Sequence, residues 1–172
     1  LLSQKNFNFE LDAALPKIQF IELQPDTALA LRKLVEERLS PMLGEQHSRH
    51  WANRIVPVKD FLEQTWGTFD VIVGNPPYVR HEQIPEAEKE AYKKHFHTFR
   101  FRSDLYIPFF EHALKQLAPA GKLCYICSNR WLKNQYGAAL RQFINKHYGI
   151  RQIIDLEKTQ PFEEEVIAYP AI

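Results

Sequence analysis

An amide, two prolines and a phenol follow one another in Asn75-Pro76-Pro77-Tyr78, directly after the apolar run FDVIVG at residues 69–74. Both prolines lack a backbone N–H, and Asn75 is restricted to an extended backbone because it precedes a proline. The polar groups of this segment are therefore mainly acceptors: the Asn75 side-chain oxygen and the carbonyl oxygens of Asn75 and Pro76. A rigid pair of acceptors suits a ligand group with two N–H donors, such as an exocyclic amine or a primary amide.

Hydrogen bonds to both hydrogens of such an amine draw the nitrogen lone pair out of ring conjugation and make the nitrogen nucleophilic, with no strong general base. The Tyr78 ring offers a face on which a flat ring can stack, an interaction worth about 1–3 kcal/mol per base in nucleic-acid binders. The alternative interpretation is structural, with the proline pair serving only to end a strand tightly.

Strand-like and helix-like patterns alternate around this motif and predict an α/β fold with a mostly parallel sheet flanked by helices. The motif then leaves the carboxyl end of a strand, which is the edge where open α/β sheets bind ligands. The expected strands are 17–23, 54–61, 69–74 (deeply buried), 121–128, 150–156 and 165–172. The expected helices are 25–39, 86–96, 103–118 and 134–148, and residues 40–54 are expected to form a loop.

Three local features support the expected helices. The first has an apolar stripe of Leu31, Leu34, Val35 and Leu39. The second has a Glu90–Lys94 pair at i, i+4 spacing, which stabilises a helix. The third has Ser103 or Asp104 as its cap and Pro108 near its first turn.

Composition sets the broad class of the protein. The 172 residues suffice for one domain with a core, and the chain has no apolar run long enough to span a membrane. The first residues lack the layout of a secretory signal, which favours the cytoplasm. With a net charge of only +1, any contact with nucleic acid must come from a local basic patch.

The two cysteines, Cys124 and Cys127, lie three residues apart in an expected strand, so their thiols point to opposite faces. We therefore expect two buried thiols and no metal site, since the seven histidines are scattered along the chain.

One basic and aromatic segment, residues 92–102, follows the motif. Its cationic side chains are candidates for contacts with a DNA backbone, and the alternative is an amphipathic helix end packed on the domain. The candidates are Lys93, Lys94, Arg100 and Arg102.

A series of segments in the same order resembles the N6-adenine DNA methyltransferases, specifically the gamma-class, TaqI-like and type IIG restriction-modification enzymes. The similar segments are FIELQP (20–25), VKDFL (58–62), NPPYVRHEQI (75–84), SDLYIPFFEHALKQLAPAGKL (103–123), SNRWLKNQYGAALRQFI (128–144) and IIDLEKTQPFEEEVIAYPAI (153–172). The resemblance covers about 150 residues. It implies a Rossmann-like, S-adenosylmethionine-dependent methyltransferase fold.

The resemblance also implies roles for the motif. Asn75 and the Pro76 carbonyl, held by Pro77, would accept the amino hydrogens of a target adenine, and Tyr78 would stack on the base. Phe162 would stack on the other face of the base, unless it is a core aromatic. Such an enzyme must take its base out of double-stranded DNA, because the amino group is otherwise paired.

The same resemblance assigns the cofactor, S-adenosylmethionine, to upstream residues. Glu22 would hold the ribose hydroxyls, Asp60 the adenine amine, and Phe61 would lie beside the adenine ring. The alternatives are a solvated strand end for Glu22 and a turn residue or helix cap for Asp60.

The family's glycine-rich cofactor loop is absent, since the first glycine is Gly44. The sequence therefore predicts a partial methyltransferase domain over residues 1–172, incomplete at its N-terminus and without a target-recognition domain. Residues 6–12 are a candidate substitute for the absent central strand, and Gln24 replaces the usual Asp. We expect the isolated chain to bind S-adenosylmethionine weakly or not at all; micromolar affinity by calorimetric titration would contradict this.

These features predict a site-specific DNA adenine methyltransferase of a restriction-modification system. Two alternatives remain open: a glutamine methyltransferase using the same acceptor loop, and a non-catalytic module for DNA docking or assembly. The VRHEQI extension and the SDLY and SNRW segments favour DNA over glutamine. Oligomeric state and the DNA recognition sequence have no signal in the sequence.

Overall fold

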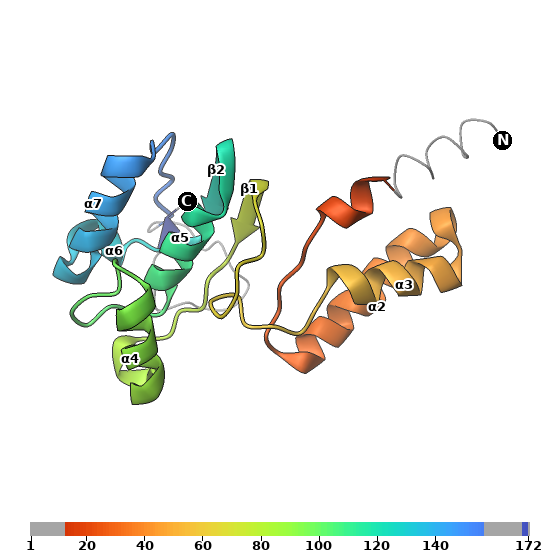
Figure 1. Ribbon diagram of the computed structural model, residues 1–172, viewed down its shortest axis with the longest axis horizontal. Coiled ribbons are helices and arrows are strands. Elements are labelled where there is room, and N and C mark those ends of the chain that lie inside the picture. Colours follow the sequence, from red (N-terminus) through yellow and green to blue (C-terminus); the bar gives the residue numbers. More distant parts are fainter. Residues whose placement is uncertain (1–12, 157–169, 172) are drawn as a thin grey trace. The chain divides into compact units, whose positions relative to one another are not determined.

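The computed structural model of the chain describes residues 13–156 and 170–171 (Figure 1). The chain divides into two compact units, Leu1–Gln64 and Thr65–Ile172, and each is described by itself. Residues 6–12 and Phe162, with their predicted roles, lie outside the described residues.

The first unit is built on two helices, α2 (Pro25–Leu43) and α3 (Glu45–Ile55), preceded by the short turn η1 (Leu15–Lys17). Pro25 occupies the first position of α2, where its missing N–H costs no hydrogen bond. Gly44, at φ +79°, ends α2 and starts α3. The two helices enclose a small apolar core made of Leu15, Ala28, Leu39, Trp51, Ile55 and Val56.

The loop predicted over residues 40–54 is therefore wrong, because α2 continues through Pro41 and α3 follows Gly44 at once. The predicted helix 25–39 is confirmed and extended. Its apolar stripe is partly wrong: Leu39 is buried, and Leu31 and Val35 pack against the core, but Leu34 is exposed.

The two strands predicted in this unit are reduced to one parallel bridge between Glu22 and Val58. Arg54 and Ile55, expected in the second strand, form the last turn of α3. Two flanking hydrogen bonds extend the pairing, from Phe20 N to the Ile55 carbonyl (2.8 Å) and from Lys59 N to the Glu22 carbonyl (3.0 Å). Two segments that pair with no further strand in the described part of the chain make only a marginal sheet, which explains why the pairing stays short.

The second unit contains a parallel strand pair, β1 (Phe69–Gly74) and β2 (Leu117–Tyr125), with Val73 opposite Cys124 and Gly74 opposite Tyr125. A second, antiparallel pair joins β3 (Cys127–Ser128) to β4 (Pro170–Ala171).

The boundaries predicted for β1 are confirmed, but its deep burial is wrong: Val71 is 59% and Val73 73% exposed. Side chains alternate between the faces of a strand, and only one face of this pair packs on helix α5. Cys124 lies on the open face and is exposed, whereas Cys127 is buried. The expectation of two buried thiols is therefore wrong for Cys124.

The helices of the second unit are α4 (Glu86–His95), α5 (Tyr106–Lys115), α6 (Arg130–Lys133) and α7 (Ala138–His147), with single turns η2 (His81–Gln83) and η3 (Gln135–Gly137). Helix α5 packs on β2 and on α7 (Figure 1). The Phe110 ring of α5 lies 5.1 Å from the Tyr125 ring and 5.5 Å from the Trp131 ring, centroid to centroid. These aromatic contacts form the centre of the core.

The predicted helix 86–96 is confirmed, and its expected Glu90–Lys94 pair is replaced by an ion pair between Glu90 and Lys93. The helix predicted over 103–118 is shorter at both ends, and neither Ser103 nor Asp104 caps it. The helix predicted over 134–148 begins as a 3-10 turn. Residues 150–156 form no strand beyond an isolated bridge at Asp155.

Helices and a parallel strand pair together are compatible with an α/β methyltransferase fold. None of the helices in the described ranges, 13–156 and 170–171, is long and apolar enough to cross a membrane.

Candidate active site

The base of the Asn75–Tyr78 loop is fixed by the end of the sheet. A side chain at Gly74 would place its Cβ 2.9 Å from Cε1 of Tyr125, so the close approach of this ring requires glycine. The Ile126 amide donates to the Gly74 carbonyl (3.1 Å). Asn75 follows at the carboxyl end of β1 as an exposed residue, and Pro76 behind it is buried. The acceptor side chain therefore stands on a rigid support.

Tyr78 is half-buried, and its hydroxyl is inaccessible to solvent without a hydrogen-bond partner among the described residues. Burial, and then the negative charge of an ionised Cys127, raises the pKa of the Tyr78 phenol to about 12. The phenol therefore stays protonated at neutral pH and does not act as a base. Its ring, rather than its hydroxyl, is the part of the side chain suited to a ligand.

Asp104 holds the segment that follows the motif. Its Oδ1 accepts from the His81 amide (3.1 Å), and its Oδ2 accepts from the Tyr136 hydroxyl (3.1 Å). The Tyr136 hydroxyl lies 2.9 Å from that of Tyr106. The Leu105 amide donates to the Val79 carbonyl at 2.9 Å. The loop is thus tied to the start of α5 and to η3.

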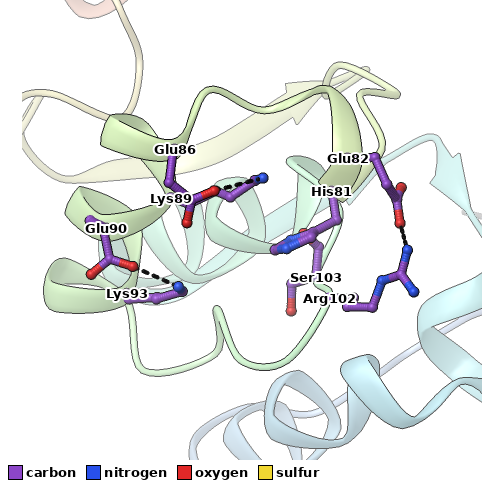
Figure 2. Close-up of polar contacts among 8 residues, drawn as sticks. All are labelled: His81, Glu82, Glu86, Lys89, Glu90, Lys93, Arg102 and Ser103. Carbon is purple, nitrogen blue, oxygen red and sulfur yellow. Dashed lines mark hydrogen bonds and ion pairs between the residues drawn. The ribbon is translucent and has the colours of Figure 1, made fainter.

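Burial raises the pKa of both tyrosines in this network, that of Tyr136 to about 12. His81 makes a further link, since its Nδ1 lies 3.2 Å from the Ser103 carbonyl, an acceptor that requires the proton on Nδ1 (Figure 2). The sequence did not single out Asp104, Tyr136 or His81 as site residues. Their only signal was membership of the SDLY, QYG and VRH segments of the resemblance.

Glu22 and Asp60, the predicted cofactor residues, lie on adjacent segments of the first unit. Glu22 is in the bridge with Val58, and its carbonyl accepts from Lys59, the residue before Asp60. Glu22 Oε1 accepts from the Gln24 amide and Asp60 Oδ1 from the Leu62 amide, both at 2.8 Å. The Asp60 contact is the turn-type bond of the alternative interpretation.

Each of these carboxylates uses one oxygen locally, and no partner for its second oxygen occurs within the described part of the chain. Carboxylate acceptors on neighbouring segments have the chemistry needed for a ribose diol and an amine. Phe61, next to Asp60, is half-buried. These acceptors, with the Phe61 ring, have the chemistry to hold an adenosine group. Asn75–Tyr78 belong to the second unit.

All four predicted DNA-backbone residues are exposed. Lys93 forms an ion pair with Glu90 (2.7 Å), and Arg102 forms one with Glu82 (Figure 2). Arg100 donates to the Lys93 carbonyl (3.3 Å). Exposed ion pairs contribute little free energy, so a phosphate can replace the carboxylate partner. Lys94, the fourth residue, is exposed on α4.

A largely apolar cavity of about 390 Å³ lies between α5, β2, α7 and residues 149–154. None of the predicted site residues within 13–156 lines it. Among the described residues, no group of three or more His, Cys, Asp or Glu side chains is arranged to hold a metal ion.

Comparison with known proteins gives the class. The family model of the Eco57I restriction-modification methylase matches residues 12–162, most of the chain. The chain belongs to this family.

Individual relatives are Type II methyltransferases by name. The chain is 53% identical over 161 residues to M.BstVI of Geobacillus stearothermophilus, covering 90% of this chain and 29% of that protein. It is 49% identical over 105 residues to M.XhoI of Xanthomonas vasicola, covering 61% and 19%. It is 37% identical over 169 residues to M.PaeR7I of Pseudomonas aeruginosa, covering 95% and 29%. The chain thus spans less than a third of these relatives.

Proposed function

We propose that the full-length protein is a DNA methyltransferase of a restriction-modification system, which transfers a methyl group from S-adenosylmethionine to N6 of an adenine. The observation that carries the proposal is the exposed Asn75 on a fixed, proline-bounded loop at the carboxyl end of β1. Family membership supports the reaction class, and the names of the relatives support its place in a restriction-modification system.

Asn75 and Pro76 would act on the nucleophile. The Asn75 side-chain oxygen and the Pro76 carbonyl would each accept one N6–H of the adenine, which concentrates the lone pair on nitrogen. S-adenosylmethionine, when bound, supplies an electrophilic methyl group. Methylated N6 then loses one proton through these acceptors to water. The transfer requires no strong general base, which is consistent with a Tyr78 phenol that stays neutral.

Tyr78 would stack on the extruded adenine. Its ring is half-buried and its hydroxyl is inaccessible to solvent, so the face of the ring is the part that can receive a flat ligand. The cost of extruding a base is a few kcal/mol, and stacking worth about 1–3 kcal/mol offsets part of it. Phe162 remains the proposed second stacking residue.

Glu22, Asp60 and Phe61 would hold the cofactor. The two carboxylates would accept from the ribose hydroxyls and from the adenine amine, and the Phe61 ring would pack beside the adenine. The partners of the protein are thus double-stranded DNA and S-adenosylmethionine, and its proposed location is the cytoplasm.

Methylation of a glutamine amide is a second candidate, because a primary amide presents the same two N–H donors. The VRH segment, which Asp104 and Ser103 hold through His81, favours DNA, since it belongs to the extension that resembles the DNA methyltransferases. A non-catalytic docking role is the third, and the intact acceptor loop speaks against it.

The test is Asn75→Ala in the full-length protein, assayed for methyl transfer to DNA. We expect a loss on the order of 10²–10³-fold, the usual cost of removing one hydrogen-bonding group that acts in the transition state. Asn145→Ala, an exposed asparagine on α7, is the matched control. Unchanged transfer by the Asn75 variant, with cofactor binding intact, would refute the catalytic role.

A further inference from the structure

Phe101 is an aromatic residue held in the open. Its side chain is 66% exposed, and its backbone has φ +55°, in the left-handed region. A bulky residue rarely adopts this conformation, and it does so at a cost in free energy. An exposed phenylalanine in a strained backbone has no evident role in stabilising this fold. Strained residues that persist in this way cluster at functional sites.

Buried contacts on both sides of Phe101 hold the strained turn. Phe99 is fully buried, with its ring 5.6 Å from that of Tyr92. Before it, the fully buried Glu111 carboxylate accepts from the amides of Thr98 (2.7 Å) and His97 (3.2 Å). These buried contacts fix the backbone that leads into Phe101.

Ser103 closes the turn on the other side. Its hydroxyl donates to the Arg100 carbonyl (2.5 Å) and accepts from the Arg100 amide (3.2 Å), and Ser103 itself is fully buried. The chain thus fixes residues 99 and 103 in the core and projects the three residues between them. Phe101 is therefore exposed because the buried residues on both sides of the turn fix its backbone.

The turn adjoins the segment that follows Tyr78. The Ser103 carbonyl contacts His81, and Arg102 pairs with Glu82 of the same segment (Figure 2). Exposed arginines, Arg100 and Arg102, flank Phe101 in the sequence. An apolar ring between two cations, beside a loop proposed to receive a base, is complementary to DNA: the ring suits the base stack and the cations suit phosphates.

We propose that Phe101 is an apolar wedge that enters the base stack of DNA next to the adenine being extruded, while Arg100 and Arg102 contact the adjacent phosphates. This inference rests on the proposed DNA methyltransferase function. Side chains inserted between base steps unstack them, which favours extrusion of a neighbouring base. The arginines would pair with phosphates, and the Phe101 ring would unstack the bases.

The experiment compares Phe101→Gly with wild type in the full-length protein. Glycine adopts positive φ without strain, so the turn keeps its shape while the ring is lost. Ala120→Gly is the matched control, because Ala120 is exposed and has φ +65° in β2. It relieves the same kind of strain without removing an aromatic ring. Phe101→Trp restores a stacking ring.

The probe is a DNA duplex that the wild-type protein methylates, with 2-aminopurine replacing the base beside the target adenine. At saturating protein, wild type, Ala120→Gly and Phe101→Trp should raise the 2-aminopurine fluorescence, and Phe101→Gly should abolish the rise. Phe101→Gly should also weaken DNA binding about 5- to 140-fold, the loss expected for one base–aromatic stack.

A Phe101→Gly protein that methylates DNA and raises the fluorescence like wild type would overturn the wedge and leave the proposed function intact. A wild-type protein that methylates no DNA would instead overturn the proposed function, and the wedge with it.

Discussion

The acceptor loop and the cofactor segments differ in how they are held. The loop after Tyr78 is linked to α5 and η3 through Asp104, His81 and Tyr136, residues distant in sequence. Within the described residues, Glu22 and Asp60 make side-chain hydrogen bonds only to amides two residues away. The long-range hydrogen bonds fix the conformation of the acceptor loop within the second unit. Glu22 and Asp60 have only local hydrogen bonds among the described residues, so a bound ligand or further chain must fix their side chains.

The second unit contains the motif and the residues that hold it. The first unit has no glycine before Gly44, and therefore no glycine-rich loop before Glu22. The bond network therefore predicts that changes in the second unit act on stability or turnover, and changes in the first act on cofactor affinity.

The largest effect is expected for Glu111→Ala. It removes the charged partner of two backbone N–H groups, the buried amide of Thr98 and the part-buried amide of His97, and hydrogen bonds to charged groups are worth about 1.5–3 kcal/mol each. We expect the free energy of unfolding to fall by about 2–6 kcal/mol, measured by urea denaturation of the chain. Glu88→Ala, an exposed glutamate on α4, is the control. An equally small loss of unfolding free energy in both variants would contradict this role of the Glu111 carboxylate.

The same carboxylate gives a pH dependence. Burial alone raises the pKa of Glu111, but hydrogen bonds from Lys115, Thr98 and His97 outweigh it and leave the pKa below the ordinary 4.5. A lowered pKa in the folded state stabilises the protein above pH 4.5, and this contribution is lost as the pH falls through the folded value. The stability gap between wild type and Glu111→Ala should therefore narrow below pH 4.5.

Glu22→Ala tests the first unit. In the full-length protein we expect the Kd for S-adenosylmethionine to rise about 10- to 100-fold, since hydrogen bonds to charged groups are worth about 1.5–3 kcal/mol. Glu37→Ala, an exposed carboxylate on α2, is the control. Isothermal titration measures both. Equal affinities would return Glu22 to the role of a solvated strand end.

The smallest effect is expected for Asp104, which acts through other residues as a positioning residue. Asp104→Ala should lower kcat about 10-fold with little change in KM for DNA, because misplacing a loop weakens transition-state contacts first. Asp104→Asn should recover most of the activity, since its amide can accept from His81 and donate to Tyr136. If Asp104 had a purely structural role, both variants would lose stability, and kcat would not fall separately from KM.

The fold was predictable where a local pattern and its tertiary context agree. β1, helix α4 and the exit into Asn75 were placed correctly because strand alternation and proline chemistry act over a few residues. Residues 40–54 were misread because Pro41 is tolerated inside α2, where packing against α3 outweighs the lost hydrogen bond. The strands expected at 54–61 and 150–156 need sheet neighbours, and apolar content alone does not supply them.

The site was predictable only in part for the same reason. Asn75, Glu22 and Asp60 were found through motifs. Asp104, Tyr136 and Glu111 act through contacts across 13 to 32 residues, which no local pattern encodes. The strained Phe101 was visible only as one aromatic among several in a basic segment.

The most direct test is the chemical identity of the product. Full-length protein is incubated with double-stranded DNA and S-adenosylmethionine carrying a labelled methyl group, and the DNA is digested to nucleosides and analysed by mass spectrometry. We expect label in the deoxy form of N6-methyladenosine, and loss of that label with Asn75→Ala. Label in a cytosine, or in a protein glutamine with none in DNA, would contradict it.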